Sequence, residues 1–152
     1  MLKVRHVGFT GTREGMSEHQ KEMLSRILTA ALVQGDPIFF HHGDCKGADA
    51  EAHEIMCQLR ENVKNIPAPK IVIHPPVKRV MRAYCQGADE ILPPQDYLDR
   101  DRAIVDCCIG MIAAPKTNKE ELRSGTWYTV RYARKTSKPV FILNRNENTE
   151  TG

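Results

Sequence analysis

Three glycine-containing turns carry the residues of this sequence that could do chemistry. Each turn combines glycine with hydroxyl or charged side chains between an apolar run and a helical pattern: Gly11-Thr12-Arg13, Gly43 to Asp49, and Ser124-Gly125-Thr126. Glycine lets backbone N–H groups approach a ligand closely, and the N-terminus of the following helix favours an anion. One such turn is ordinary connection chemistry, but three together predict a site for phosphate or carboxylate groups.

Side chains in and beside these turns form the predicted ligand-binding set. It consists of Gly11, Thr12, Arg13, Gly43, Asp44, Lys46, Gly47, Asp49, Arg100, Arg102, Ser124, Gly125, Thr126 and Tyr128. Asp49 has two open interpretations, since its carboxylate could complement the helix dipole or accept hydrogen bonds from ribose hydroxyls. Arg100 and Arg102 begin a helix from which they either reach the ligand or form surface salt bridges. Tyr128 is the candidate for stacking on a base, whereas the helical spacing of Trp127 predicts a core residue.

Two neighbouring histidines, His41 and His42, precede the second turn, and with Asp44 they could suggest a metal site. Neighbours on a strand point to opposite faces of the sheet, however, and no further ligand stands at a metal-like spacing. We therefore expect core or pocket-lining histidines, and the sequence predicts no metal and no cofactor.

Apolar patterns typical of strands and helices alternate along the chain. Strands are predicted at residues 3–9, 37–40, 70–74, 109–114 and 140–143. Helices are predicted after Ser17, after Gly47, from Asp96 and after Ser124. This alternation predicts an α/β fold with a doubly wound parallel sheet of about five strands, Rossmann-like in class. In such sheets a ligand binds beyond the carboxyl ends of the strands, where strand order reverses, and all three glycine turns fall at that edge.

Length and hydropathy limit the architecture. With 152 residues, 41% of them hydrophobic, we expect one domain at residues 1–143 and a disordered tail at 144–152. The longest apolar stretch, 109–115, is shorter than the roughly 20 residues of a membrane helix, and the N-terminus lacks an apolar signal region. A cytoplasmic protein that does not enter a membrane is therefore expected.

The cysteine pattern and the net charge argue against further classes of protein. The five cysteines form no C-x-x-C pair, so neither a disulfide framework nor a zinc ribbon is indicated. The net charge of +3 comes without a dense run of Lys or Arg, which argues against nucleic acid as a partner. A small anionic molecule is the expected partner instead.

Four motifs together resemble the SLOG superfamily over most of the chain: Gly11-Thr12-Arg13, Gly43 to Asp49, Arg100 to Asp106, and Arg123 to Trp127. This superfamily joins the LOG phosphoribohydrolases, which release a base from a nucleoside 5′-monophosphate, with the DNA-processing protein A group and with sensors of nucleotide-derived signals. The sequence is most similar in look to small stand-alone members from phages and bacterial defence islands. The resemblance implies a nucleotide or nucleotide-derived ligand, with phosphate or sugar held by the first and third turns.

The sequence departs from the LOG signature P-G-G-x-G-T-x-x-E, whose final Glu is catalytic in that family. Gly125-Thr126 is followed at that place by Thr129, and the P-G-G run is absent. The sequence therefore favours a protein that senses or sequesters its ligand. The alternative is an N-glycoside hydrolase acting on nucleoside monophosphates, with Asp49 and Glu121 as candidate catalytic carboxylates.

Residues 77–94 have no clean period and are expected to form a loop or lid with a short extended piece at 90–92. This segment could pack against a second copy of the chain. We therefore expect a homo-oligomer.

Overall fold

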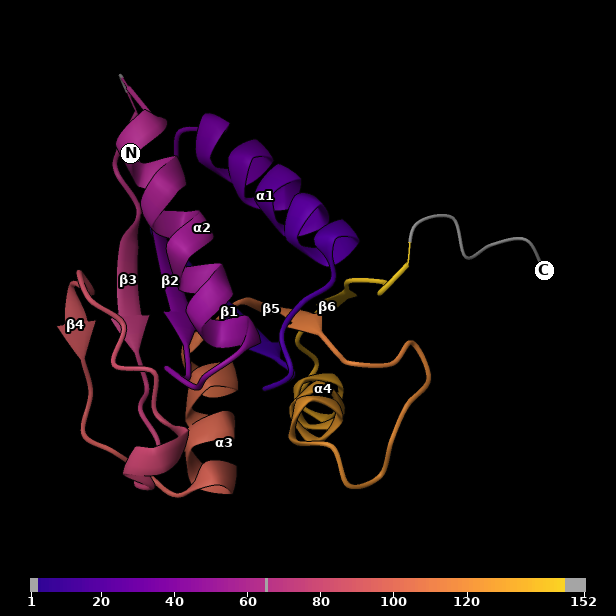
Figure 1. The fold of residues 1–152 in the computed structure, drawn as a ribbon. Coiled ribbons are helices and arrows are strands. Elements are labelled where there is room, and N and C mark those ends of the chain that lie inside the picture. Colours follow the sequence, from indigo (N-terminus) through magenta and orange to yellow (C-terminus); the bar gives the residue numbers. More distant parts are fainter. Residues whose placement is uncertain (1–2, 65, 147–152) are drawn as a thin grey trace.

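The alternating pattern folds into one parallel sheet with helices on both faces, and the computed structural model describes residues 3–64 and 66–146 (Figure 1). In chain order the elements are β1 (Arg5–Gly11), α1 (Glu18–Val33), β2 (Ile38–His42), α2 (Ala48–Asn62), β3 (Lys70–Ile73), the 3₁₀ helix η1 (Arg79–Met81), β4 (Glu90–Ile91), α3 (Tyr97–Cys107), β5 (Gly110–Ala114), α4 (Gly125–Lys135) and β6 (Val140–Ile142). The predicted doubly wound, Rossmann-like α/β fold is confirmed, with six strands where the sequence predicts about five.

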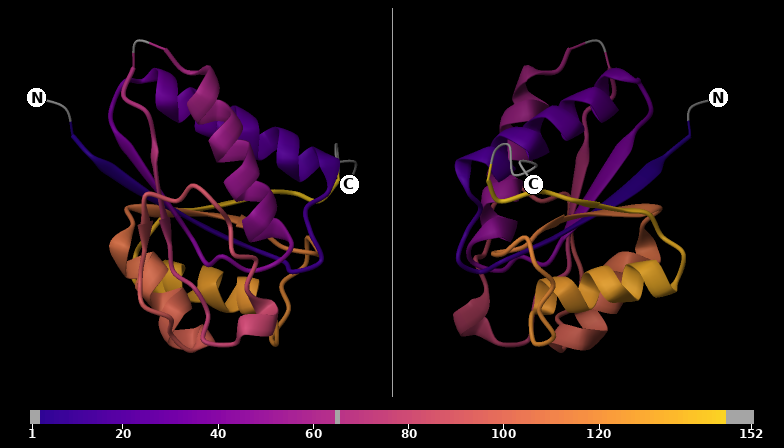
Figure 2. Two further views of the ribbon diagram at one scale, coloured as in Figure 1. Left: turned by 60° about the vertical axis from the view of Figure 1, so that its left-hand side comes forward. Right: turned by 90° about the vertical axis from the view of Figure 1, so that its right-hand side faces the viewer.

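The strand order β4-β3-β2-β1-β5-β6 reverses between β1 and β5. Strand β1 pairs in parallel with both neighbours, so that Gly8 lies opposite His41 on β2 and Met111 on β5. Helices α1 and α2 pack together on one face of the sheet, and α3 and α4 on the other (Figures 1 and 2). The carboxyl ends of β1, β2 and β5 therefore meet at the switch point, where doubly wound sheets bind ligands.

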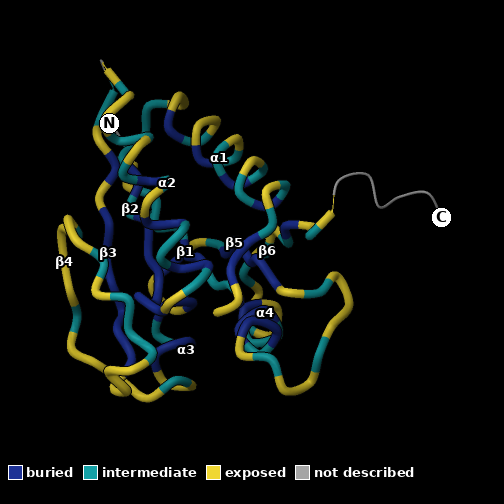
Figure 3. Tube along the Cα trace, in the orientation of Figure 1, coloured by how far each residue is buried: buried dark blue, intermediate teal, exposed yellow. Residues whose placement is uncertain are grey.

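Apolar side chains pack beneath the helices on both faces, and the buried residues follow the central strands (Figure 3). Phe9 and Phe40 pack with Leu24 of α1 on one face, and Met111 packs under α3 and α4 on the other. Trp127 is only 4% exposed, which confirms its prediction as a core residue. Within the part of the chain that the structure describes, no helix has the length and apolarity needed to cross a membrane.

The start of α1 fixes the strand ends beside the switch point. The Gln20 N–H donates to Ser17 Oγ at 3.1 Å, and the Ser17 N–H donates to Gln20 Oε1 at 3.0 Å, a capping box. Gln20 is fully buried, and its Nε2 donates to the carbonyl oxygens of Pro115 and Leu143 at 2.9 and 3.0 Å. The cap of α1 therefore also holds the chain where it leaves β5 and β6.

Residues 77–94 contain η1 and the two-residue strand β4, which is the extended piece expected at 90–92. Strand β4 forms one edge of the sheet, with Ile91 opposite Ile73 of β3. Val77, Val80 and Ile91 are exposed. The segment thus leaves apolar side chains uncovered at that edge.

The first residues of the expected tail contact the body of the protein. Arg145 Nη1 donates to the carbonyl oxygen of Gly15 at 2.9 Å, and the Arg145 N–H donates to Asn118 Oδ1 at 2.7 Å. Arg145 is therefore ordered against the turn after β1. Residues 147–152 of the expected tail lie outside the described residues.

Candidate functional site

A cavity of about 740 Å³ lies at the carboxyl edge of the sheet, where β1 and β2 end. Its wall contains parts of all three glycine turns, the first residues of α3 and the loop that leads into α4. The predicted site residues that line it are Gly11, Thr12, Arg13, Gly43, Asp49, Arg100, Glu121, Ser124, Gly125 and Thr126. Segments far apart in the sequence thus face one cavity.

Three predicted residues of the second turn lie outside the cavity lining: Asp44, Lys46 and Gly47. The Asp44 carboxylate is fully buried and accepts a hydrogen bond from Arg82 Nε at 2.7 Å. Lys46 is exposed. Gly47 has a φ of 90°, and a Cβ there would lie 2.2 Å from the carbonyl oxygen of Arg13. Asp44 and Gly47 therefore shape the turn from behind the cavity wall.

Arg102 and Tyr128 also lie outside the cavity lining. Arg102 Nη1 donates to the Tyr128 hydroxyl at 3.2 Å, and Arg102 Nη2 pairs with Asp99 at 2.8 Å. Of the two interpretations that the sequence allows for Arg102, the structure shows the surface salt bridge. Helical geometry explains the difference from Arg100, because residues two apart on a helix point to different sides.

Among the lining residues that are absent from the predicted set are Cys45, Tyr97, Asp101, Lys116 and Arg123. The hydroxyl of Tyr97 is buried and has no hydrogen-bond partner among the described residues. Arg13 lies over the Tyr97 ring, with 4.7 Å between the guanidinium carbon and the ring centroid. The only sequence signal for Tyr97 is its position at the start of the helix after Asp96. Lys116 and Arg123 stand in a loop without periodicity.

Arg100 holds the ends of β2 and β3 against α3. Its buried guanidinium donates to the carbonyl oxygens of Gly43 at 2.7 Å and His74 at 3.3 Å, and its Nε donates to Asp101 at 2.8 Å. Burial opposes the positive charge, but Asp101, Cys45 and Asp49 outweigh burial and raise the pKa of Arg100. Arg100 is therefore a permanently charged part of the cavity wall.

Asp49 is a buried carboxyl group in the same wall. Burial raises its pKa to about 6, although Arg100 and the Cys45 N–H, which donates to Asp49 Oδ2 at 3.2 Å, lower it. Close to neutral pH a fraction of Asp49 is therefore protonated. In that form the side chain can donate a hydrogen bond to a ligand as well as accept one.

Four N–H groups of the second turn are occupied within the protein. Those of Asp44, Cys45, Lys46 and Ala48 donate to protein acceptors, and the acceptor for Ala48 at the start of α2 is the Thr12 carbonyl oxygen. At the start of α4, Ser124 Oγ accepts from the Trp127 N–H at 3.2 Å. The N–H groups of Gly125 and Thr126 donate to no acceptor within residues 3–64 and 66–146. The N-terminus of α4 therefore has two N–H groups in the cavity lining that are open to an anion.

Two cationic side chains in the cavity wall carry no counter-charge. Lys116 pairs with Glu14 at 3.4 Å, but Arg13 and Arg123 form no ion pair with an acidic residue of the described chain. Both are exposed. Their guanidinium groups are available for bidentate contacts with a phosphate or carboxylate.

His41 and His42 are buried core residues on opposite faces of the sheet, as the sequence predicts. The sequence has no further ligand at a metal-like spacing, but the fold brings metal-type side chains beside both histidines. His74 and Cys107 lie beside His41, and His53 and Cys85 lie beside His42. Except for His53, each of these side chains stands more than 30 residues along the chain from the histidine that it neighbours. The sequence spacing could therefore not reveal them.

No family model matches the chain, and neither does any curated protein. The molybdenum cofactor binding protein from the phototrophic bacterium Rippkaea orientalis has a similar structure, with a TM-score of 0.68 at 16% identity over 96% of this chain and 80% of that chain. The Moco carrier protein from Chlamydomonas reinhardtii gives 0.65 at 17% identity, over 97% and 81%. TM1055, a structural genomics target, gives 0.56 at 16% identity, over 92% and 72%. At these identities the likeness shows the fold: the chain is an α/β protein of the Rossmann-like class.

Gly43→Ala is expected to displace Arg100, because the added Cβ would lie 2.2 Å from Arg100 Nη1 and 3.0 Å from Asp49 Oδ2. Overpacking of this kind costs about 1–3 kcal/mol. Urea denaturation measures this as a lower free energy of unfolding. Gly125→Ala is the matched control, since nothing lies within 4 Å of its added Cβ and alanine favours the helix. Equal losses in both variants would contradict the role assigned to Arg100.

Asp49→Asn is expected to raise the free energy of unfolding at pH 7, with the gain fading toward pH 4. Burial raises the pKa of Asp49 from 3.8 to about 6. Between these values the folded state binds the proton more tightly, so wild-type stability contributed by this group falls as pH rises. Asparagine has no charge to bury and can still accept the Cys45 N–H.

One pKa unit corresponds to about 1.4 kcal/mol, so the difference between the two proteins at pH 7 is on the order of 2–3 kcal/mol. Urea denaturation of both proteins from pH 4 to pH 8 measures it, and all other titrating groups cancel in the comparison. A difference that stays constant across this range would show that Asp49 does not titrate there.

Proposed function

We propose that the chain binds a phosphate-bearing small molecule of the nucleotide or nucleotide-derived class in this cavity, and that it senses or sequesters this ligand. One observation carries the proposal. Arg13 and Arg123, whose guanidinium groups form no ion pair among the described residues, line the cavity. Gly125 and Thr126, whose N–H groups donate to no acceptor among those residues, line it as well. Such an arrangement favours an anion with several oxygen acceptors.

The remaining wall suits a planar ring system attached to that anion. The cavity volume of about 740 Å³ is within the usual range for small-molecule sites. Leu98 and Leu122 lie in the lining with 51% and 86% of their surfaces exposed, and Tyr97 also lines the cavity. Apolar and aromatic side chains are contacts that favour a planar base.

A molybdenum cofactor is the second candidate ligand. The similar structures from Rippkaea orientalis and Chlamydomonas reinhardtii carry titles that name binding or carriage of this cofactor. These titles describe those proteins, and the fold they share with this chain is the reason to include the cofactor in the test.

Hydrolysis of a nucleoside monophosphate is the alternative activity within the SLOG interpretation. Asp49 and Glu121 both line the cavity, and Glu121 Oε1 accepts a hydrogen bond from the Thr117 hydroxyl at 3.2 Å. Thr129 stands where the LOG enzymes have their catalytic Glu, and its hydroxyl donates to the Gly125 carbonyl oxygen at 2.9 Å. A buried helix-bonded hydroxyl at that place supports capture over hydrolysis.

Recovery of the natural ligand separates these candidates. The protein is purified without added nucleotide and denatured, and the released molecules are analysed by mass spectrometry together with elemental analysis for molybdenum. A nucleotide or its derivative supports the leading proposal, whereas stoichiometric molybdenum supports the second candidate. Chromatography after incubation with nucleoside monophosphates detects free base, which would establish the hydrolase alternative. No binding in a calorimetric panel of nucleotides and no recovered ligand would contradict the proposal.

Cytoplasmic location, a role in phage or bacterial defence and self-association belong to the same proposal. The exposed Val77, Val80 and Ile91 of the segment 77–94 give self-association its physical basis. Light scattering of the purified chain measures the assembly, and a monomer at micromolar concentration would contradict it.

Arg13→Ala and Arg123→Ala are each expected to weaken binding of the strongest nucleotide in that panel by about tenfold or more. A hydrogen bond to a charged group contributes about 1.5–3 kcal/mol, and each variant removes such a donor. Isothermal titration calorimetry at fixed ionic strength measures the loss. Arg26→Ala removes the same charge from the exposed face of α1 and should leave affinity unchanged. An equal loss in all three variants would mean that only overall charge matters.

A further inference from the structure

Two groups of metal-type ligands lie on opposite faces of β2, outside the cavity lining. One group is His41, His74 and Cys107, and the other is His42, His53 and Cys85. In each group the nitrogen and sulfur atoms that could bind a metal lie within 4.8 Å of one another. The two groups differ in how the protein already uses their ring nitrogens.

The histidines on the α2 face form a complete hydrogen-bonded chain. The Asp44 N–H donates to His42 Nδ1 at 3.0 Å, so His42 must carry its proton on Nε2. His42 Nε2 lies 2.9 Å from His53 Nδ1, and His53 Nε2 lies 2.7 Å from the Gln86 carbonyl oxygen. A backbone donor at one end and a backbone acceptor at the other fix both tautomers. No lone pair of these rings is left for a metal.

The histidines on the α3 face lack such anchors. His41 Nδ1 lies 2.8 Å from His74 Nε2, and His41 Nε2 lies 2.9 Å from His6 Nδ1. A neutral imidazole carries one N–H, so His41 donates in only one of the two contacts. No backbone group of the described chain bonds to these ring nitrogens. When His41 donates from Nε2 to His6, its Nδ1 lone pair faces the His74 nitrogen.

We propose that His41, His74 and Cys107 form a binding site for a borderline-soft divalent transition metal ion of the zinc type. Two imidazole nitrogens and one thiolate are the ligands that zinc prefers, and three protein ligands leave a fourth position for water. His6 accepts the remaining N–H of His41 and so fixes the orientation of that ligand. Binding converts the Cys107 thiol into a metal-bound thiolate and releases its proton to solvent.

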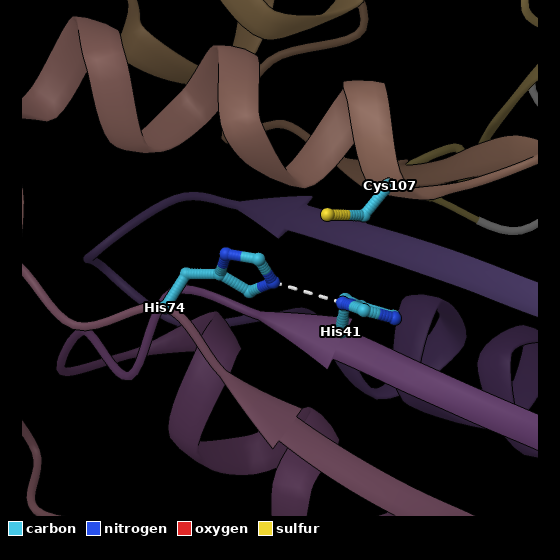
Figure 4. A group of neighbouring side chains, drawn as sticks. All are labelled: His41, His74 and Cys107. Carbon is cyan, nitrogen blue, oxygen red and sulfur yellow. Dashed lines mark hydrogen bonds between the residues drawn. The ribbon is translucent and has the colours of Figure 1, made fainter. Parts of the chain in front are cut away.

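The three ligand atoms, now within 4.8 Å of one another, must move to reach the geometry of a bound zinc ion. Tetrahedral zinc places two nitrogen ligands about 3.3 Å apart and a nitrogen and a sulfur about 3.6 Å apart. The His41 and His74 nitrogens, now at 2.8 Å, must therefore separate by about 0.5 Å. Cys107 is exposed at the last residue of α3, and Figure 4 shows its sulfur directed toward the histidine pair. The exposed thiol gives the ion a path to two buried rings.

This site is separate from the cavity. Cys107 ends α3 and Tyr97 begins it, and ten residues of helix span about 15 Å. The metal test needs no ligand in the cavity, so its failure is distinguishable from a failure of the proposed ligand binding.

Cobalt(II) tests the site because a bound thiolate gives cobalt a charge-transfer absorption. Reduced, chelator-treated protein is titrated with Co²⁺, and the expected result is one equivalent bound, with this absorption, followed by displacement with Zn²⁺. Cys107→Ser should abolish the absorption without affecting the fold, because Cys107 is exposed. Cys85→Ser is the matched control from the other group and should retain it.

Two further variants examine the histidines. His74→Gln should lose stoichiometric binding, with circular dichroism to confirm that it folds, and His6→Ala should weaken Co²⁺ affinity about 10–100-fold as loss of an outer partner does. Absence of stoichiometric Co²⁺ binding by the wild-type protein would overturn the proposal. Persistence of the absorption in Cys107→Ser, or its loss in Cys85→Ser, would overturn it as well.

Discussion

The buried guanidinium of Arg100 is the constraint on which the cavity depends. A charge removed from water must be matched by polar partners, and Arg100 is matched by Asp101 and by the carbonyl oxygens of Gly43 and His74. These bonds tie the ends of two neighbouring strands to the first turn of α3. The same guanidinium occupies the space where a side chain at position 43 would stand. Glycine at position 43 is therefore required by Arg100.

Pairing of charges decides what the cavity can hold. Four basic side chains, Arg13, Arg100, Lys116 and Arg123, and four acidic ones, Glu14, Asp49, Asp101 and Glu121, line it. Two cations are paired within the wall, and burial keeps Asp49 partly protonated near neutral pH. Glu121 and the ionised fraction of Asp49 offset Arg13 and Arg123, so the charges of the wall nearly cancel in sum. Their placement is what favours an anion, because Arg123 stands directly before Ser124 and Gly125 at the start of α4.

Local sequence signals, such as helix caps and apolar runs, were sufficient to predict most of the fold. Ser17 and Ser124 cap the helices where the sequence predicts, and the apolar run at 109–114 is the strand β5 beside the switch point. The site was less predictable because its decisive contacts are not local. The Thr12 carbonyl oxygen accepts from the Ala48 N–H at the helix end that the sequence marks as an anion site. Arg123 reaches the cavity from a loop that no periodicity describes.

Strand β2 illustrates how one segment serves two different chemistries. Its consecutive histidines point to opposite faces, and the outcome depends on whether a backbone group anchors the chain of rings. On the α2 face the anchors fix every proton and the histidines act as polar core residues. On the α3 face the proton direction is free, and a thiol stands beside the rings. Since Arg100 bonds the carbonyl oxygen of His74 and that of Gly43, any displacement of His74 reaches the cavity wall through one side chain.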